Sequence, residues 1–188
     1  MEGGGRHVQR ERATAVTSPH ATRRPTCSLV FLLVRALIYA AIFIGVVLVY
    51  VPGGILASAG VTRPATIGRA ETAGMIMVAV GVALALWCVL TFAVVGKGTP
   101  APFDPPRRLV VSGPYRVVRN PMYLGAGLAV AGTALFYGSA GLWWFTGAFL
   151  LIIHLFILGY EEPTLRRSFG DDYESYLERV GRYWPRRR

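Results

Sequence analysis

The sequence predicts an all-α membrane protein with about four transmembrane helices. Of its 188 residues 53% are hydrophobic and only 16% charged, and the apolar residues form long uninterrupted blocks. A soluble domain of this size rarely carries such blocks, and a helix needs about 20 apolar residues to cross a bilayer. The blocks are residues 29–51, about 73–95, and 122–160, the last long enough for two crossings and divided near residues 138–141.

The Lys and Arg residues predict how the spans are oriented. Five arginines precede the first span, five basic residues lie between the second and third, and seven follow the fourth. The loop between the first two spans holds Arg63 and Arg69, and Arg35 lies inside the first span. Because Lys and Arg concentrate in cytoplasmic loops, we expect both termini and the central loop to be cytoplasmic.

We therefore attribute the net charge of +10 to basic residues that set the orientation of the spans and contact anionic headgroups of the bilayer. It does not indicate a nucleic-acid partner, since the sequence contains no basic folded module. Cys27 lies in the N-terminal tail and Cys88 in a predicted span, so they offer neither a disulfide framework nor a paired-cysteine metal site. The sequence does not indicate an oligomeric state.

Composition divides the chain into three regions. Residues 1–28 are rich in Gly, Arg, Thr, Ser and Pro, which predicts a disordered cytoplasmic tail. Residues 29–160 form the transmembrane domain, in which Pro52-Gly53-Gly54 is expected to end the first helix and residues 96–98 the second. Residues 99–114 contain five prolines and are expected to form an extended cytoplasmic loop.

The third region, residues 161–188, is predicted to be a cytoplasmic segment that completes a cofactor site. Its apolar positions trace one helical stripe with charged residues opposite: Leu165, Phe169, Tyr173, Tyr176, Leu177 and Val180. Gly170 followed by Asp171 predicts an interruption, with Asp171 as a new N-cap. We expect a bent amphipathic helix that lies on the headgroups or folds over the site.

The third and fourth spans are predicted to form a helical hairpin through a tight turn at residues 138–141. The third span is rich in Gly and Ala, which let helix backbones approach closely in lipid. The hairpin would return Glu161 and Glu162 to the cytoplasmic face, near Arg119 and Tyr123.

The segment 113–125, GPYRVVRNPMYLG, places basic and aromatic side chains where a loop enters the third span. Arg116 and Arg119 are three residues apart and share a face if they are helical, although both also suit membrane anchoring. Pro121 disfavours helix at Asn120 and starts the span. The free N–H groups of such a helix start can bind an anionic group of a ligand.

Glu161 and Glu162 stand at the end of the fourth span, where the helix dipole opposes acidic residues. They are either solvated acids or, as we predict for at least one, a ligand or a structural ion pair. A carboxylate can hold an ammonium group or a ribose hydroxyl, and a guanidinium can hold a carboxylate. S-adenosylmethionine needs both kinds of partner.

Tyrosines near the two clusters and His154 in the fourth span have two interpretations each. Aromatic residues accumulate at membrane interfaces, but one of them could stack on an adenine or face a sulfonium. An ionisable group inside a membrane is a functional candidate, but a neutral histidine bonded to a neighbouring helix is common.

These residues resemble the isoprenylcysteine carboxyl methyltransferase and phospholipid methyltransferase superfamily of integral membrane enzymes, over about residues 107–188. The matching positions are Gly113, Pro114, Tyr115, Arg116, Arg119, Pro121, Tyr123, Gly125, Glu161, Glu162, Leu165, Phe169, Gly170, Tyr173, Tyr176, Arg182 and Pro185. Asn120 stands where the family usually has His, which can titrate while Asn cannot. The resemblance implies that S-adenosylmethionine binds at the cytoplasmic mouth, between the hairpin and the C-terminal segment.

The predicted function is S-adenosylmethionine-dependent methyl transfer to a lipophilic or membrane-embedded acceptor, whose identity stays open. The predicted cofactor-binding residues are Tyr115, Arg119, Asn120, Pro121, Tyr123, Gly125, Glu161, Glu162, Tyr173 and Tyr176. The predicted catalytic residues are Arg116, which would orient the acceptor, and Glu161 and Glu162, either of which could act as a base. The alternatives are an NADPH-dependent reductase of sterol-like membrane lipids and a small non-enzymatic transporter or scaffold.

Overall fold

The computed structural model describes residues 29–96 and 109–186, and within these ranges every regular element is helical. The predicted tail (1–28) and most of the proline-rich loop lie outside the described residues. The longer helices are α1 (Leu29–Ile44), α2 (Val51–Ser58), α3 (Arg69–Thr91), α4 (Pro121–Tyr137), α5 (Ala140–Phe156) and α6 (Glu162–Arg179). Short π or 3₁₀ turns adjoin them: η1 (Gly45–Tyr50), η2 (Phe92–Gly96), η3 (Gly113–Arg116) and η4 (Ile157–Glu161).

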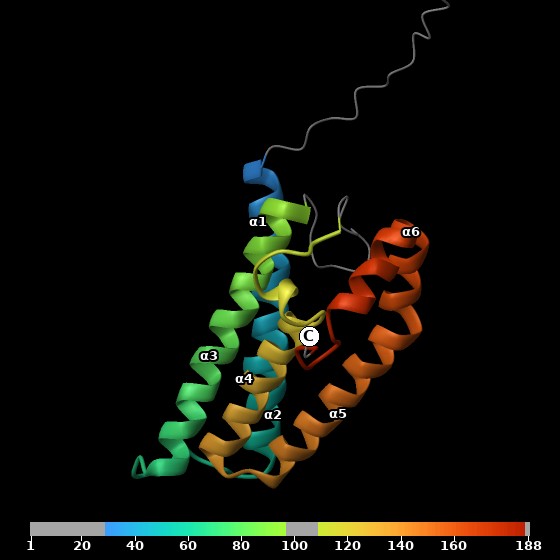
Figure 1. Cartoon of the computed structure of the whole chain (residues 1–188). Coiled ribbons are helices and arrows are strands. Elements are labelled where there is room, and N and C mark those ends of the chain that lie inside the picture. Colours follow the sequence, from blue (N-terminus) through green and yellow to red (C-terminus); the bar gives the residue numbers. More distant parts are fainter. Residues whose placement is uncertain (1–28, 97–108, 187–188) are drawn as a thin grey trace, which may run out of the picture.

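The described helices make this an integral membrane protein. Three of them, Leu37–Ser58, Arg69–Val95 and Ala140–Arg179, are long and apolar enough to cross a bilayer, and Pro121–Tyr137 is a shorter apolar helix. Figure 1 shows α3, α4 and the α1–α2 unit packed side by side, while α5 diverges from α4 towards α6. The all-α class is confirmed for the described residues, and four crossings remain our prediction.

The expected end of the first helix at Pro52-Gly53-Gly54 is wrong, because the helix continues to Ser58. Proline lacks an N–H, and its ring clashes with the carbonyl one α-turn earlier. The chain relieves this clash by widening into η1, in which Val51 N–H bonds to the Val46 carbonyl. Continuing the helix keeps the backbone hydrogen-bonded, which lipid requires.

The predicted hairpin of the third and fourth spans is present, but the closest neighbour of α4 is α3. Gly138 has a left-handed backbone (φ 58°) and links α4 to α5. Gly132 of α4 lies so close to α3 that a Cβ on it would be 2.7 Å from the Gly74 carbonyl oxygen. Gly125 and Gly81 make a second such contact further along. Pairs of small residues let two membrane helices touch through their backbones.

The predicted bend at Gly170 is confirmed. Gly170 has φ 50° and ψ −125° inside α6, and the exposed pair Arg166–Glu174 bridges the bend at 2.9 Å. The predicted apolar stripe packs across the bend into one cluster, joined by Leu109. The second half of α6 therefore lies over the loop that precedes α4 (Figure 1).

Candidate functional site

The candidate site lies where α4 begins and where η4 ends, at the end of the molecule that carries α6 (Figure 1). Here the chain after α6 runs beside the chain before α4. Val118 and Gly181 form a parallel bridge. Arg119 N–H donates to the Gly181 carbonyl at 2.9 Å and Asn120 N–H to the Arg182 carbonyl at 3.3 Å. We call residues 180–186 the C-terminal strap.

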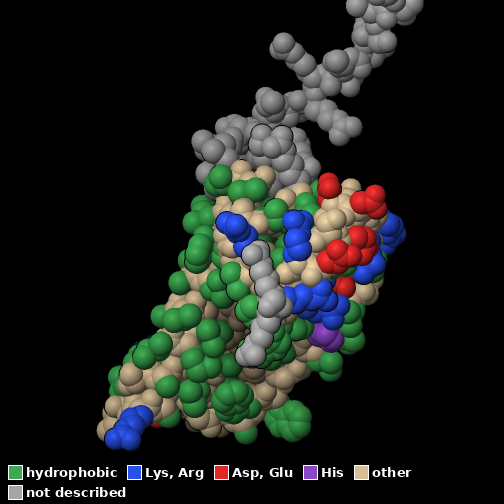
Figure 2. Space-filling model, viewed as in Figure 1, with side chains coloured by type: hydrophobic (Ala, Val, Ile, Leu, Met, Phe, Trp, Pro, Cys, Tyr) green, Lys and Arg blue, Asp and Glu red, His purple; other side chains and the backbone are tan. Residues whose placement is uncertain are grey.

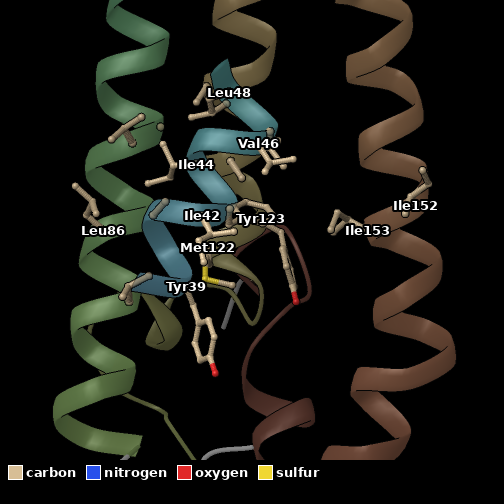
Figure 3. Close-up of a pocket in the computed structure, with 18 of the residues that line it drawn as sticks. Tyr39, Ile42, Ile44, Val46, Leu48, Leu86, Met122, Tyr123, Ile152 and Ile153 are labelled. Atoms are coloured by element: carbon tan, nitrogen blue, oxygen red, sulfur yellow. The ribbon is translucent and has the colours of Figure 1, made fainter. Parts of the chain in front are cut away.

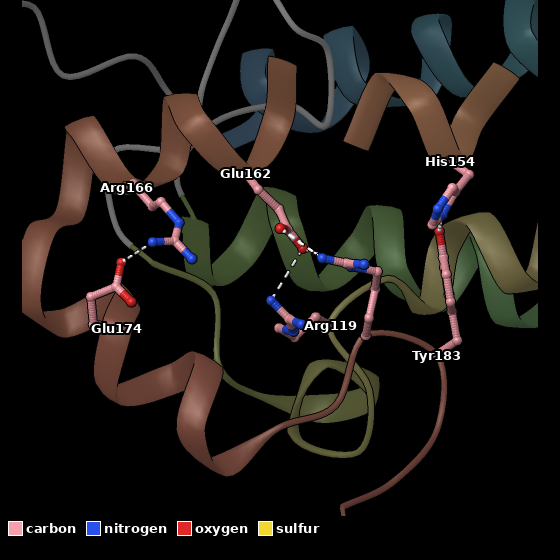
Figure 4. A network of polar contacts seen from close by, with 7 residues as sticks. Arg119, His154, Glu162, Arg166, Glu174 and Tyr183 are labelled. Atoms are coloured by element: carbon pink, nitrogen blue, oxygen red, sulfur yellow. Dashed lines mark hydrogen bonds and ion pairs between the residues drawn. The ribbon is translucent and has the colours of Figure 1, made fainter. Parts of the chain in front are cut away.

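Glu162 is the centre of a buried ion-pair network (Figure 4). Arg182 grips both of its carboxylate oxygens, with Nε to Oε1 and Nη2 to Oε2 at 2.9 Å each. Arg119 Nη1 donates to Oε1 at 3.2 Å. The hydrogen bond to Glu162 raises the pKa of Arg182 above its usual value. This network ties the loop before α4, the start of α6 and the strap together.

Glu161 has a different partner from its neighbour. Its Oε2 accepts a hydrogen bond of 2.8 Å from the phenol of Tyr123, in the first turn of α4. The turn η4 is wider than an α-turn, since Glu162 N–H bonds to the Ile157 carbonyl. We attribute to this widening that one of the two adjacent glutamates contacts α4 and the other contacts the loop before it. Pro163 lies two residues after the end of η4, as Pro52 lies two residues after the end of η1. Single π turns of this kind are frequent at functional sites.

The expected contact between the segment that leads into α4 and the two glutamates is thus confirmed. Arg119 contacts Glu162 and Tyr123 contacts Glu161, although about forty residues separate the partners in sequence. One of the two glutamates is held in a structural ion pair, which was one of the outcomes expected for them.

The other predicted tyrosines are largely packed. Tyr115 is buried against Cys88 of α3, and its ring lies 5.2 Å from that of Phe92 in η2. Burial raises the pKa of its phenol well above the usual value. Tyr176 donates to the Tyr115 carbonyl at 2.7 Å, so it fixes α6 over η3. Tyr173 is buried beside it in the same apolar cluster.

Of the four remaining predicted residues, three are buried and one is exposed. Asn120 is buried at the N-cap of α4 without making a side-chain cap bond, and Pro121 is the buried first residue of that helix. Gly125 faces Gly81 of α3, so helix packing accounts for it. Arg116 is exposed at the end of η3 and takes no part in the described ion-pair network.

Two contacts of the strap were not predicted from sequence. Arg182 was matched only as part of a motif, and its carboxylate partner is 20 residues away, across the bend in α6. The Tyr183 hydroxyl lies 2.9 Å from Nδ1 of His154 in α5 (Figure 4). His154 therefore bonds to the strap. A neighbouring helix would have been the more common partner for a histidine in a membrane span.

The charged side chains gather at this end of the molecule. Figure 2 shows hydrophobic side chains over most of the visible lower surface, with acidic and basic side chains concentrated around α6 and the strap. Further basic side chains lie at the opposite tip. A polar site therefore adjoins an apolar body.

A family model described as phospholipid methyltransferase matches residues 70–172. The match covers more than half of the chain, from the start of α3 to just beyond the bend in α6, and includes Arg119, Tyr123 and both glutamates. No curated protein and no solved structure matches the chain.

Proposed function

Since the chain belongs to the phospholipid methyltransferase family, we propose that it transfers a methyl group from S-adenosylmethionine to a lipophilic acceptor in the bilayer. Family membership makes it a membrane methyltransferase, while the donor, the acceptor class and the residue roles are our proposal. The observation that carries it is the Tyr123–Glu161 contact, which lies beside the Arg119–Glu162–Arg182 network.

The residues present fit S-adenosylmethionine. Nε of Arg119 is buried, and no hydrogen-bond partner for it lies within the described part of the chain. Such an unpaired donor suits the carboxylate of an amino-acid moiety. Glu161 offers a carboxylate for an ammonium group or a ribose hydroxyl. Asn120, the residue after Arg119, is buried and supplies an amide that both donates and accepts.

The two glutamates then have separate tasks. Both oxygens of Glu162 are engaged by arginines, so its task is to hold the Arg119 guanidinium in place. We therefore propose Glu161 as the glutamate that contacts ligand, together with Arg119, Asn120 and Tyr123. Tyr115, Gly125 and Arg116 are left out because of their packing or their exposure.

S-adenosylmethionine, when bound, supplies a methyl group on a sulfonium, whose C–S bond breaks with the electron pair remaining on sulfur. The new bond forms from a lone pair of the acceptor, so the protein has to align the acceptor and exclude water. An amine or alcohol acceptor must also lose a proton, and we propose Glu161 as the base that takes it. A carboxylate or thiolate acceptor loses no proton.

We propose that the site faces the cytoplasm. The positive-inside bias of the sequence supports this orientation. So does the fold, in which Arg119, Arg166 and Arg182 all lie at the α6 end. The donor is water-soluble and would enter from that side.

The test is incubation of membranes containing the protein with S-adenosylmethionine labelled in the methyl group. We expect label in the lipid fraction, and we expect S-adenosylmethionine to raise the melting temperature of the purified protein. A melting shift with NADPH and none with S-adenosylmethionine would instead favour a reductase.

A further inference from the structure

His154 is the only ionisable residue in the sequence of α5, and its side chain points towards the strap (Figure 4). An ionisable side chain inside a membrane span is costly and is therefore a functional candidate. The residue before it, Ile153, lines an apolar cavity of about 540 Å³ between α1, η1, α3, α4 and α5 (Figure 3). His154 does not line this cavity, so we looked for its role on the side of the strap.

The bond between His154 and Tyr183 joins the strap to a helix that crosses the membrane. The Tyr183 hydroxyl lies 2.9 Å from Nδ1 of His154, and the centres of the two rings are 5.9 Å apart. His154 precedes Glu161 by seven residues, which is about 10 Å along a helix. The strap is therefore bound to α5 at a point deeper in the apolar body than the two glutamates.

The neighbour of Tyr183 in the strap is Arg182, whose guanidinium grips Glu162. The strap is thus held at two depths, by Arg182 at the start of α6 and by Tyr183 in α5. Its backbone in turn accepts hydrogen bonds from the N–H groups of Arg119 and Asn120. Displacing the strap would therefore release two residues that we propose bind the donor.

The strap is a tight turn with few buried side chains. A side chain on Gly181 would collide with the carbonyl of Trp184, so the turn is compact at Arg182 and Tyr183. Val180 is buried, but none of the side chains from 181 to 186 is, and Trp184 is 82% exposed. Segments with few buried apolar contacts open at a low cost in free energy. The position of the strap therefore depends on its few hydrogen bonds.

The surroundings of Tyr183 keep its phenol protonated. Burial raises the pKa of Tyr183 above its usual value, against a smaller lowering by Arg182. The charges of Glu162 and Glu161 raise it as well, so the phenol lies within the electric field of both glutamates. A protonated phenol donates and accepts, and a neutral imidazole has one donor and one acceptor nitrogen. The bond to His154 can therefore form with either tautomer of the imidazole.

We propose that His154 is a positioning residue for the methyl transfer: through Tyr183 it holds the strap in the place where Arg119 and Asn120 can bind the donor. The inference rests on the proposed function and adds to it two residues that act without touching S-adenosylmethionine. When only one state of a protein binds a ligand, the apparent affinity falls with the population of that state. Removing the bond should therefore weaken donor binding.

Hydrogen exchange of the full-length protein in phosphatidylcholine nanodiscs measures the strap directly. The amides of Arg119 and Asn120 are bonded to carbonyls of the strap, so they exchange when the strap leaves. Tyr183→Phe keeps the ring and removes the hydroxyl. We expect exchange of these two amides to become about three- to tenfold faster, the effect of one neutral hydrogen bond. Unchanged exchange at both amides would overturn the proposal.

Tyr137→Phe is the matched control for this measurement. Tyr137 is the last residue of α4, at the other end of that helix from the site. Its hydroxyl makes no hydrogen bond within the described part of the chain, so exchange at Arg119 and Asn120 should stay as in the wild type. A general loss of stability in Tyr183→Phe would speed exchange along all the helices, and that result would also overturn the proposal.

Calorimetric titration of S-adenosylmethionine tests the consequence for binding. Tyr183→Phe and His154→Leu should each weaken binding by about three- to tenfold. The double variant should lose no more than either single one, because both remove the same bond. The amide of His154→Asn can replace Nδ1 as the partner of Tyr183, so this variant should bind nearly like the wild type. Full additivity in the double variant, or equal losses in the Asn and Leu variants, would overturn the proposal.

The titration also separates this inference from the proposed function. If the wild type binds S-adenosylmethionine and both Tyr183→Phe and His154→Leu bind it equally well, this inference fails and the proposed function stands. If the wild type does not bind S-adenosylmethionine, the pair has no donor to position, and both proposals fail.

Discussion

Glu161 and Glu162 are chain neighbours whose surroundings differ in charge. Glu162 neutralises part of the charge of Arg119 and Arg182, whereas Glu161 faces a neutral phenol. A carboxylate that holds two guanidinium groups in a buried place stabilises the fold only while all partners are present. The two glutamates should therefore respond differently to the same substitution.

Glu162→Gln should destabilise the folded protein by about 2 kcal/mol, because it leaves the partly buried guanidinium groups of Arg119 and Arg182 without their carboxylate. The measurement is thermal unfolding of the purified protein in detergent. Glu174→Gln is the control, since Glu174 also pairs with an arginine in α6, but at an exposed position. Exposed pairs are worth less than about 1 kcal/mol. Equal losses in the two variants would show that the buried network does not stabilise the fold.

Among the helices, α3 and α4 are in the closest contact, and the candidate site lies at the start of α4. Gly74 and Gly81 are seven residues apart on α3, and Gly125 and Gly132 are seven apart on α4, so the two pairs meet as the helices run antiparallel. This contact fixes the start of α4, and with it the position of Tyr123.

Gly81→Ala should cost about 1–3 kcal/mol of stability, the usual cost of forcing an extra methyl group into a packed interface. The new methyl group would overlap the backbone of Gly125 and Ala129. Thermal unfolding is again the measurement. Gly147→Ala in α5 is the matched control, because no neighbouring atom lies within 4 Å of the added methyl group. It should be neutral or slightly stabilising. A control that loses as much as Gly81→Ala would point to helix propensity and away from packing.

At the scale of the whole molecule, the sequence predicts the all-helical class and the meeting of its two polar clusters. Long apolar blocks and the tight turn near Gly138 were enough for this, because hydropathy and chain length leave few ways to arrange a hairpin. Gly170 was predicted to bend the last helix because a glycine followed by aspartate is a local signal.

The features that the sequence did not reveal depend on partners distant in the chain. Pro52 resembles a helix end, yet the helix continues through it after a π turn, since lipid leaves the backbone no water to bond. The seven-residue spacing of glycines in α3 acquires meaning only opposite the same spacing in α4. The pairing of Arg182 with Glu162 depends on the path of the chain after Gly170, which no local pattern encodes.

We propose that the first turn of α4 and the end of η4 form one cofactor site, in which Glu161 contacts S-adenosylmethionine. Calorimetric titration of S-adenosylmethionine into Glu161→Gln tests this most directly, with the exposed Glu178→Gln as control. A hydrogen bond to a charged group is worth about 1.5–3 kcal/mol, so we expect the affinity of Glu161→Gln to fall at least about tenfold. The control should bind like the wild type. Wild-type affinity in Glu161→Gln would show that Glu161 does not contact S-adenosylmethionine.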